Sequence, residues 1–212
     1  NMDDTTEVTY EIVQPVAWDF IETTPALISL TKDSGAFVYE TLAARHETSR
    51  QTLRTLLSQS SFNVLDVNLR PPFYSEDLMQ ELFGFAHLVK INHHELEEMT
   101  QYLGQFSQNH ERAIALMGAY KDMEGVIVTR GAQGAMFVNA SGQVWENPGF
   151  RVEVKDTIGS GDSFLAAFLS RWLKKDPIEK CLDYACALGA MVASHAGANP
   201  HIQEEDIKKF IS

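Results

Sequence analysis

The stretch from Asp156 to Asp162, which reads Asp-Thr-Ile-Gly-Ser-Gly-Asp, constrains the fold and chemistry of this chain more than any other. Its glycines, Gly159 and Gly161, let the backbone adopt positive φ and bring N–H groups close to a ligand. Apolar residues then recur every three or four positions from Phe164 onwards, which predicts a helix. The stretch therefore opens onto a helix N-terminus, where free N–H groups and the helix dipole can hold an anion such as phosphate.

A carboxylate beside such an anion site suggests a particular chemistry. Asp162 lies in the positive field of the helix terminus and can accept a proton next to a bound phosphate. This combination predicts phosphoryl transfer to a hydroxyl. A helix that merely begins with a Gly-Ser-Gly-Asp cap is the simpler alternative, and a Gly-x-Gly pattern alone does not exclude it.

The longer pattern resembles the second signature of the ribokinase-like (phosphofructokinase-B type) carbohydrate kinases, whose core reads Asp-Thr-x-Gly-Ala-Gly-Asp. Ser160 stands where Ala is commoner, which is a change of one small residue for another. The resemblance implies that Asp162 is the catalytic base. It also implies that the amides of Gly159, Ser160 and Gly161 form an anion hole for the transferred phosphate.

Composition narrows the function classes. A chain of 212 residues that is 44% hydrophobic can bury a sizeable core in one domain, or in one domain with an appendage. Its net charge of −12 argues against nucleic acid or an anionic membrane as a partner. Cys181 and Cys186 lie five apart in a helical pattern, which suits neither a disulfide framework nor a metal site and favours a reducing cytoplasm. We find no apolar run near the ~18 residues of a membrane span and no signal segment.

The chain alternates strand and helix patterns, which is typical of an α/β domain with a parallel sheet. The resemblance implies the three-layer α/β/α ribokinase-like fold with a mostly parallel sheet. Because the family is usually longer, it also implies that the N-terminal third, with most of the lid, is missing. We expect residues 1–32 to be a lid remnant and re-entry segment, and residues 33–212 to be the nucleotide-binding core. Lid-mediated dimers in the family make a homodimer an expectation.

The predicted elements follow from the same periodicities. Strands are expected at 8–13, 36–39, 63–67, 88–91, 125–129 and, as a hairpin with its turn at Ser141-Gly142, at 135–138 and 143–146. Helices are expected around 25–30, after a Thr48 or Ser49 cap, after a Ser75 cap, after Asn92, at 109–120, after the glycine loop to about 175, from Pro177 as first residue, and at 204–211.

Polar residues follow the strand predicted at 63–67. Asp66, Asn68 and Arg70 lie near its C-terminal end, where open α/β sheets bind ligands, and share one side if the chain is still extended there. The segment is similar to the Asp-x-Asn-x-Arg segment of family fructokinases and 2-keto-3-deoxygluconate kinases. That resemblance implies a substrate site formed with Asp162, with Arg70 near the sugar or its phosphate. A solvated loop with a surface arginine is the plainer alternative.

Two further motifs resemble the family's nucleotide site. Asn92 and Glu95 are three apart and can address one ion or its waters from one helix face. They resemble the Asn-x-x-Glu motif, which implies a water-mediated Mg²⁺ and contact with ATP phosphates. Thr129, Gly131 and Gly134 resemble the Thr-x-Gly-x-x-Gly segment beside those phosphates, although ordinary turn chemistry also explains both glycines.

The late stretch Gly197-Ala198-Asn199-Pro200 ends a helix pattern rich in small residues. In the family this region borders the adenine, so the resemblance implies that Asn199 lies near the nucleotide. Together with the carbonyls of Asp156 and Thr157, the region also implies a monovalent-cation site that could take K⁺.

These motifs predict an ATP-dependent sugar kinase that phosphorylates a primary hydroxyl, with fructose the expected acceptor and 2-keto-3-deoxygluconate or another sugar the alternative. The chain has no Gly-x-x-x-x-Gly-Lys-Ser/Thr loop, which disfavours a P-loop enzyme, and its late glycine loop lacks the third glycine of a dinucleotide site. The alternative from another class is a non-catalytic nucleotide- or sugar-binding fragment or regulator. The missing N-terminal third favours that alternative, because the sugar pocket and lid should depend on it.

Overall fold

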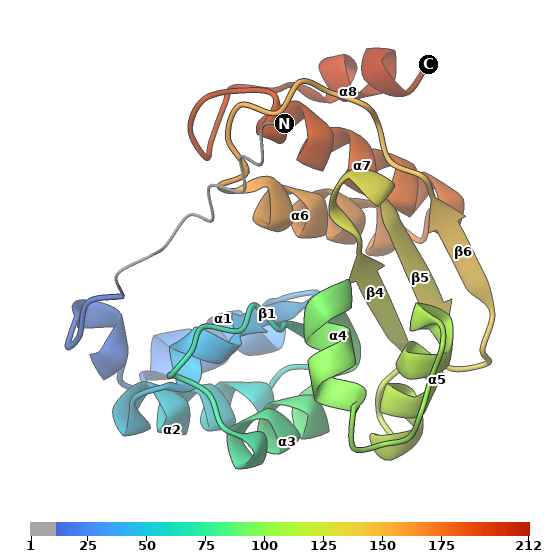
Figure 1. Ribbon diagram of the computed structural model, residues 1–212. Helices are drawn as coiled ribbons and strands as arrows, with labels where there is room; N and C mark the ends of the chain where they lie inside the picture. The colour runs from blue at the N-terminus through green and yellow to red at the C-terminus, as the bar shows by residue number, and fades with distance from the viewer. Residues whose placement is uncertain (1–11) are drawn as a thin grey trace.

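A six-stranded sheet runs through the molecule (Figure 1). The computed structural model describes residues 12–212. The sheet order follows the sequence. The first four strands are parallel, the fifth is antiparallel to the fourth, and the sixth is antiparallel to the fifth. Its strands are β1 (Phe37–Glu40), β2 (Asn63–Asp66), β3 (Leu88–Asn92), β4 (Gly125–Thr129), β5 (Ala135–Asn139) and β6 (Val144–Asn147). The expected mostly parallel sheet and its terminal hairpin are confirmed.

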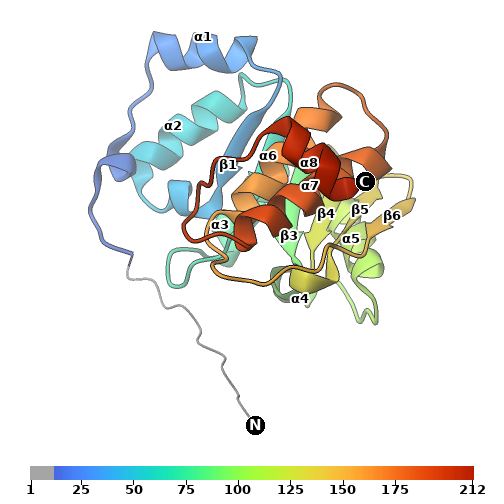
Figure 2. The same ribbon diagram turned by 90° about the horizontal axis from the view of Figure 1, so that it is seen from above.

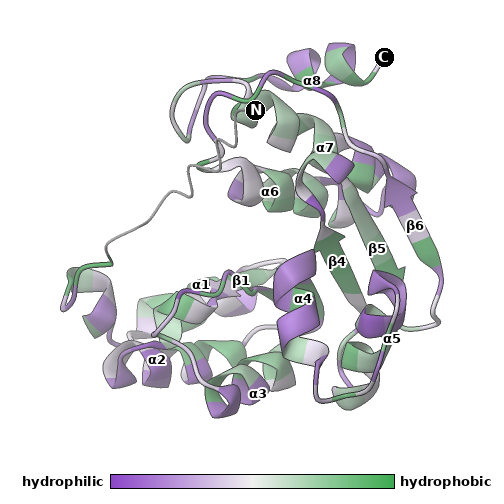
Figure 3. Ribbon diagram, viewed as in Figure 1, coloured by the Kyte–Doolittle hydropathy of each residue, from purple (hydrophilic) through white to green (hydrophobic). Residues whose placement is uncertain are grey.

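The central strands are apolar on both faces because helices cover both sides. Alternate residues divide between two cores: Leu65 and Val89 face one, while Val64 and Leu88 face the other. Figure 3 shows the same pattern as continuous green along β4 and β5. All four of these side chains are essentially inaccessible to solvent.

Helices form the two outer layers (Figures 1 and 2). One face packs against α2 (Glu47–Leu57), α3 (Glu76–Phe85), α4 (His93–Thr100) and α5 (Asn109–Ala119). The other packs against α6 (Ser160–Trp172), α7 (Ile178–Ala193) and α8 (Glu204–Ile211). The predicted three-layer α/β/α architecture is therefore correct.

The described N-terminal segment lies beside α2. It contains the 3₁₀ helix η1 (Ala17–Phe20) and α1 (Pro25–Asp33). Asp19 is buried and forms an ion pair with Arg45, at 2.6 Å, while the Trp18 ring lies 4.0 Å from the Arg45 guanidinium. The strand expected at 8–13 falls mostly outside the described residues, and residues 12 and 13 are not in a strand.

The cap of α2 differs from the prediction. His46 is the capping residue, and its Nδ1 accepts a hydrogen bond from Thr48 N. Ser49 lies within the helix, where its hydroxyl accepts from Ile21 N at 2.9 Å and donates to the Trp18 carbonyl at 2.7 Å. The hydroxyl that was predicted to cap the helix therefore fastens the N-terminal segment to it. Ser75 does cap α3, accepting from Leu78 N.

Two other helix starts also differ. α6 begins at Ser160, so the second half of the glycine loop forms its first turn. Pro177 precedes α7 as its N-cap, with ψ 148°, instead of being its first helical residue. The two other short 3₁₀ helices are η2 (Thr41–Ala44) and η3 (Gly131–Gln133).

Both cysteines are free and buried. Burial raises the pKa of the Cys181 thiol to about 11 and that of Cys186 to about 12, so neither is an activated nucleophile at neutral pH. Within residues 12–212, no helix combines the length and apolar character needed to cross a membrane.

Candidate active site

The carboxyl ends of the four parallel strands form one polar edge. Each of these strands ends on a polar residue: Glu40 on β1, Asp66 on β2, Asn92 on β3 and Thr129 on β4. The register pairs Glu40 with Asp66 and Asn92 with Thr129 across neighbouring strands. Three of these four are predicted site residues, and the fold brings them to the edge where open α/β sheets bind ligands.

The N-terminus of α6 approaches this edge. Gly159 is its N-cap in the left-handed conformation, with φ 77°, and a Cβ there would lie 2.4 Å from the Ala198 carbonyl oxygen. Both the dihedral angle and the close approach therefore require glycine. Ser160 N donates to the Thr157 carbonyl, at 3.2 Å.

The amides of Gly161 and Asp162 have no hydrogen-bond partner among residues 12–212. Both lie in the first turn of a 13-residue helix and are exposed. Unpaired first-turn amides at the positive end of a helix dipole are the donors that bind phosphate groups. The predicted anion hole thus has free donors, with Asp162 N added to the set and Ser160 N already used within the loop.

Asp162 faces two other carboxylates. One oxygen from each of Glu40, Asp66 and Asp162 lies within 4.8 Å of the others. Asp162 is exposed, so its carboxylate can be reached from solvent. Glu40 was not predicted, and the only signal for it in the sequence is its position at the end of a short strand.

A buried ion pair lies beneath this acidic group. Lys90 Nζ contacts both oxygens of Asp66, at 2.8 and 2.6 Å, and the two residues are only 8% and 3% exposed. Burial raises the pKa of Asp66 to about 6, because loss of solvation outweighs the opposing effect of the Lys90 ammonium. Lys90 was also missed, although a lysine inside the otherwise apolar run Leu88-Val89-Lys90-Ile91 was a visible signal.

The three residues predicted to contact the substrate do not share one side of an extended chain. Asn68 has φ 40°, so the alternation breaks there. Its amide Nδ2 donates to Glu40, at 3.2 Å, while both Asp66 oxygens are held by Lys90. Arg70 donates to the Leu69 carbonyl at 3.0 Å. Asp66 belongs to the acidic group, and Asn68 contacts that group through Glu40 from the turn that follows β2.

Asn92 and Glu95 form a reciprocal cap at the start of α4. Asn92 Oδ1 accepts from the amides of His94 and Glu95, each at 2.9 Å, and Glu95 Oε2 accepts from Asn92 N at 3.0 Å. The other Glu95 oxygen accepts from Leu69 N at 2.9 Å. Backbone amides thus hold all three oxygens in place. The two bonds to Asn92 Oδ1 use both of its lone pairs, whereas each Glu95 oxygen accepts only one bond and can still accept from water.

The two glycines after β4 differ in the space that surrounds them. At Gly134, with φ 75°, a Cβ would lie 2.0 Å from the Asn147 carbonyl oxygen, so packing of the hairpin explains this residue. At Gly131 the space around a Cβ is open, with nothing within 4 Å. Thr129 ends β4 directly beside Asn92. Gly131 also has a positive φ of 57°, so the turn alternative accounts for both glycines, and only Gly134 in addition lacks room for a Cβ.

The late segment is tied to the glycine loop. Asp156 Oδ1 accepts from Ile158 N at 3.0 Å, and Oδ2 accepts from Gly197 N at 3.1 Å. Asn199 is exposed two residues beyond this contact. The carbonyl of Thr157, predicted to face a monovalent cation, already accepts from Ser160 N. Segments about 40 residues apart in sequence thus meet beside the start of α6.

The chain has relatives of similar sequence and fold among known proteins. The chain is 28% identical over 193 residues to a 2-dehydro-3-deoxygalactonokinase of Haloferax volcanii, an alignment that covers 87% of this chain and 59% of that protein. Its fold is similar to a fructokinase of Vibrio cholerae crystallised with fructose, ADP and calcium (TM-score 0.71, 23% identity, 84% of this chain and 60% of the other).

It is also similar to an aminoimidazole riboside kinase of Salmonella enterica, crystallised with its riboside and an ATP analogue (TM-score 0.69, 21% identity, 84% and 62% covered). In each comparison the chain spans about three fifths of the other protein's length. The profile of the pfkB family carbohydrate kinases matches residues 27–205, which is most of the chain. The chain therefore belongs to the pfkB family of carbohydrate kinases.

Proposed function

We propose that the protein is an ATP-dependent sugar kinase that phosphorylates a primary hydroxyl, with fructose as the first acceptor to test. One observation carries the proposal: Asp162 and the unpaired amides of the first turn of α6 lie against the sheet edge that also holds Asn92 and Glu95. A proton acceptor, an anion site and a group able to organise a hydrated cation are the parts that phosphoryl transfer needs.

In this proposal Asp162 takes the proton from the sugar hydroxyl as the hydroxyl oxygen attacks the terminal phosphorus of ATP. The amides of Gly159, Gly161 and Asp162 stabilise charge on the moving phosphoryl group. A positioned base contributes roughly 10²- to 10⁴-fold, and alignment and electrostatics supply the rest. Ser160 serves mainly to shape the turn, because its amide is bonded to Thr157 and its hydroxyl to the Gly189 carbonyl.

The residues at the start of α4 fit a hydrated Mg²⁺. Carboxylate oxygens suit this ion, which keeps several waters, and the two oxygens of Glu95 are fixed by backbone amides with lone pairs to spare. Asn92 Oδ1 accepts from two amides and so fixes the turn that presents Glu95. When bound, Mg²⁺ offsets the charge of the triphosphate. Thr129, Gly131 and Gly134 border the phosphates, and Asn199 lies toward the adenine. A K⁺ site at the carbonyls of Asp156 and Thr157 remains part of the proposal.

The acceptor side consists of Asp66, Asn68, Arg70 and Asp162. Fructose is supported by the resemblance of the Asp-x-Asn-x-Arg segment and by the fold shared with the Vibrio cholerae fructokinase. The relative from Haloferax volcanii bears the name of a kinase for a different acceptor, so 2-keto-3-deoxygluconate and similar sugars are the alternative substrates. We further propose that residues 1–32 are a lid remnant on a core of residues 33–212, and that the protein works in the cytoplasm, with a homodimer as the assembly to test.

A non-catalytic nucleotide- or sugar-binding role is the second candidate. The observation that favours it is that the chain spans 59% of its Haloferax volcanii relative, so groups that enclose the acceptor in longer proteins need not all be present. The presence of Asp162, the free amides and the Asn92 to Glu95 pair favours catalysis.

The deciding experiment is a calorimetric titration of this chain with Mg-ATP in potassium buffer without sugar. We expect saturable one-to-one binding that weakens in Glu95→Gln. Glu97→Gln, which changes an exposed carboxylate of the same helix that pairs with Arg112, is the matched control. A folded chain that shows no binding would contradict the kinase assignment and favour the non-catalytic role. If binding is found, phosphoryl transfer to fructose, 2-keto-3-deoxygluconate and a non-sugar alcohol identifies the acceptor.

A further inference from the structure

Lys90 is a buried cation that no predicted step of the reaction uses. It lies inside β3, pairs in register with Asp66 on β2, and is 8% exposed. Its ammonium donates to both oxygens of Asp66. A Cβ built on Gly161 would lie 3.3 Å from the same nitrogen, so the ammonium also lies against the first turn of α6.

The three carboxylates above it have the spacing of a metal site. A divalent ion with oxygen ligands at about 2.0 to 2.6 Å needs ligand atoms no more than about 5 Å apart. The oxygens of Glu40, Asp66 and Asp162 meet this condition. Both oxygens of Asp66 are, however, already engaged by Lys90, and one oxygen of Glu40 accepts from Asn68. An incoming ion would therefore find few unengaged carboxylate oxygens and a positive charge beside them.

We propose that the Lys90 ammonium permanently occupies the cation position of the Glu40, Asp66 and Asp162 cluster. Lys90 is then a positioning residue: it holds Asp66 at the end of β2 and supplies within the fold the charge that an ion would otherwise bring. Mg²⁺ enters with the nucleotide at Asn92 and Glu95, and the acidic cluster does not recruit an additional ion.

This inference rests on the proposed function where it names Asp162 as the base and where it brings Mg²⁺ and the triphosphate to the site. Three carboxylates and one ammonium leave the cluster a formal charge of −2 in place of −3 at neutral pH. A less negative cluster repels the approaching triphosphate less, since like charges a few ångströms apart in a partly buried site interact strongly. Asn68, whose amide donates to Glu40, orders the same cluster from the loop after β2.

The test is a Mn²⁺ titration of the nucleotide-free chain, followed by the electron paramagnetic resonance signal of free Mn²⁺. In wild type we expect no site that depends on Glu40. In Lys90→Ser we expect one Glu40-dependent site, with an affinity for Mn²⁺ at least about tenfold higher than that of the same position in wild type. The double variant Lys90→Ser/Glu40→Gln should lose that site. Lys180→Ser, which removes an exposed lysine paired with Asp176, is the matched control and should gain none.

Lys90→Ser leaves Asp66 buried without its partner and so requires a check of folding by circular dichroism. Lys90→Gln is the second variant, because its amide can still donate to Asp66 while carrying no charge; we expect a weaker gain of Mn²⁺ binding. A folded Lys90 variant with no gain, or a Glu40-dependent site in wild type, would overturn the proposal. Because no nucleotide or sugar is present, either result is independent of whether the chain proves to be a kinase.

Discussion

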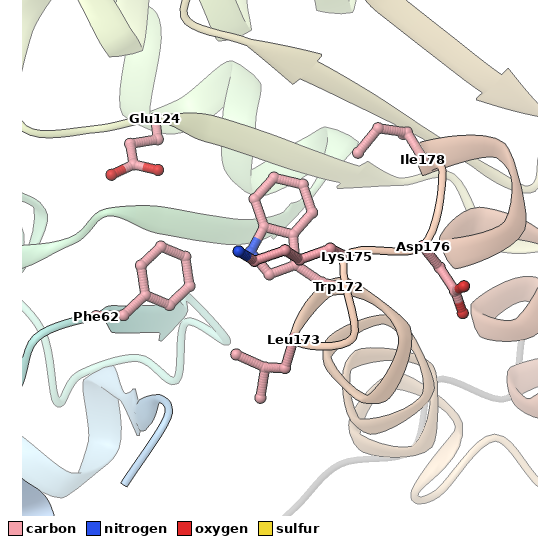
Figure 4. Close-up of a pocket in the computed structure, with 7 residues that line it drawn as sticks. All are labelled: Phe62, Glu124, Trp172, Leu173, Lys175, Asp176 and Ile178. Atoms are coloured by element: carbon pink, nitrogen blue, oxygen red, sulfur yellow. The ribbon is translucent and has the colours of Figure 1, made fainter. Parts of the chain in front are cut away.

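The two ends of the sheet are built very differently. At the carboxyl ends of the strands lie carboxylates, an ammonium and two unpaired amides. At the amino ends lies an open hollow of about 420 Å³ where side chains from the starts of β2 and β4 meet the end of α6 (Figure 4). It is lined by Phe62, Glu124, Trp172, Leu173, Lys175, Asp176 and Ile178. The hollow has room but few converging polar groups, so space alone does not identify a functional site.

The difference follows from chain direction. A strand that enters a helix delivers the helix N-terminus to the carboxyl edge of the sheet, as β3 does with α4. That edge therefore receives the free N–H groups and the positive helix ends. At the opposite edge α6 ends near Trp172, and its terminal carbonyls are bonded by the amides that follow. The direction of the chain therefore makes the carboxyl ends of the strands suited to binding anions and their amino ends suited to packing.

The largest difference between the two ends of the sheet should appear when one aspartate at each end is neutralised. We expect Asp162→Asn to lower turnover by roughly 10²- to 10⁴-fold or more, because the base is lost, while Mg-ATP affinity stays nearly unchanged. Steady-state phosphoryl transfer and calorimetry measure the two quantities. Asp176→Asn, at the amino end, should leave both intact and change stability by at most about 1 kcal/mol. Equal loss of turnover and binding in Asp162→Asn would contradict its assignment as base.

A glycine at the site should be less replaceable than one elsewhere. Gly159→Ala forces positive φ on alanine and a collision with the Ala198 carbonyl, so we expect a loss of about 2 kcal/mol or more and weaker Mg-ATP binding. Gly118→Ala in α5 meets nothing within 4 Å and should be neutral or stabilise by about 0.5 to 1 kcal/mol. Urea unfolding measures the stability of both variants. Equal losses would contradict the expectation that Gly159 is less replaceable than a glycine in α5.

The stability that contacts between α2 and α3 contribute should be independent of both ends of the sheet. Hydrogen bonds from Arg54, and then from Arg50, lower the pKa of Glu81 from 4.5 to about 2. The stabilisation is therefore present above pH 4.5 and lost as pH falls toward 2. Glu81→Gln should cost about 1 to 2 kcal/mol at pH 7 and flatten the fall in stability over that acid range. Unfolding at several pH values measures this; a change in Mg-ATP affinity at pH 7 would argue against the separation.

The smallest effect is expected in the hollow itself. Leu173 is 50% exposed, so Leu173→Ala should cost only about 0.5 to 1 kcal/mol. Nucleotide binding should be the same as in wild type, as calorimetry can check. A marked loss of Mg-ATP affinity would mean that the amino end contributes to function after all.

Short-range patterns predicted much of this molecule. The glycine loop, the Ser75 cap and the periods of the strands and helices depend on neighbours within a few residues, and the sequence displays them. The three-layer fold was expected from the family resemblance, and the cap formed by Asn92 and Glu95 was not predicted. Residues whose roles depend on distant partners were harder. Lys90 and Glu40 became site candidates only when β1, β2 and β3 were aligned. The Ser49 hydroxyl bonds to a segment about 30 residues earlier in the chain. Asn68 was predicted as a site residue, but not its left-handed conformation, which interrupts the alternation on which the shared-side argument depended.

Glu95 divides its two oxygens between separate parts of the chain. One accepts from Asn92 N at the start of α4, and the other accepts from Leu69 N, next to Arg70 in the loop after β2. A ligand that alters either hydrogen bond changes the free energy of the other. Nucleotide and acceptor affinities would then be thermodynamically coupled through this one carboxylate, each changing the other by the same factor.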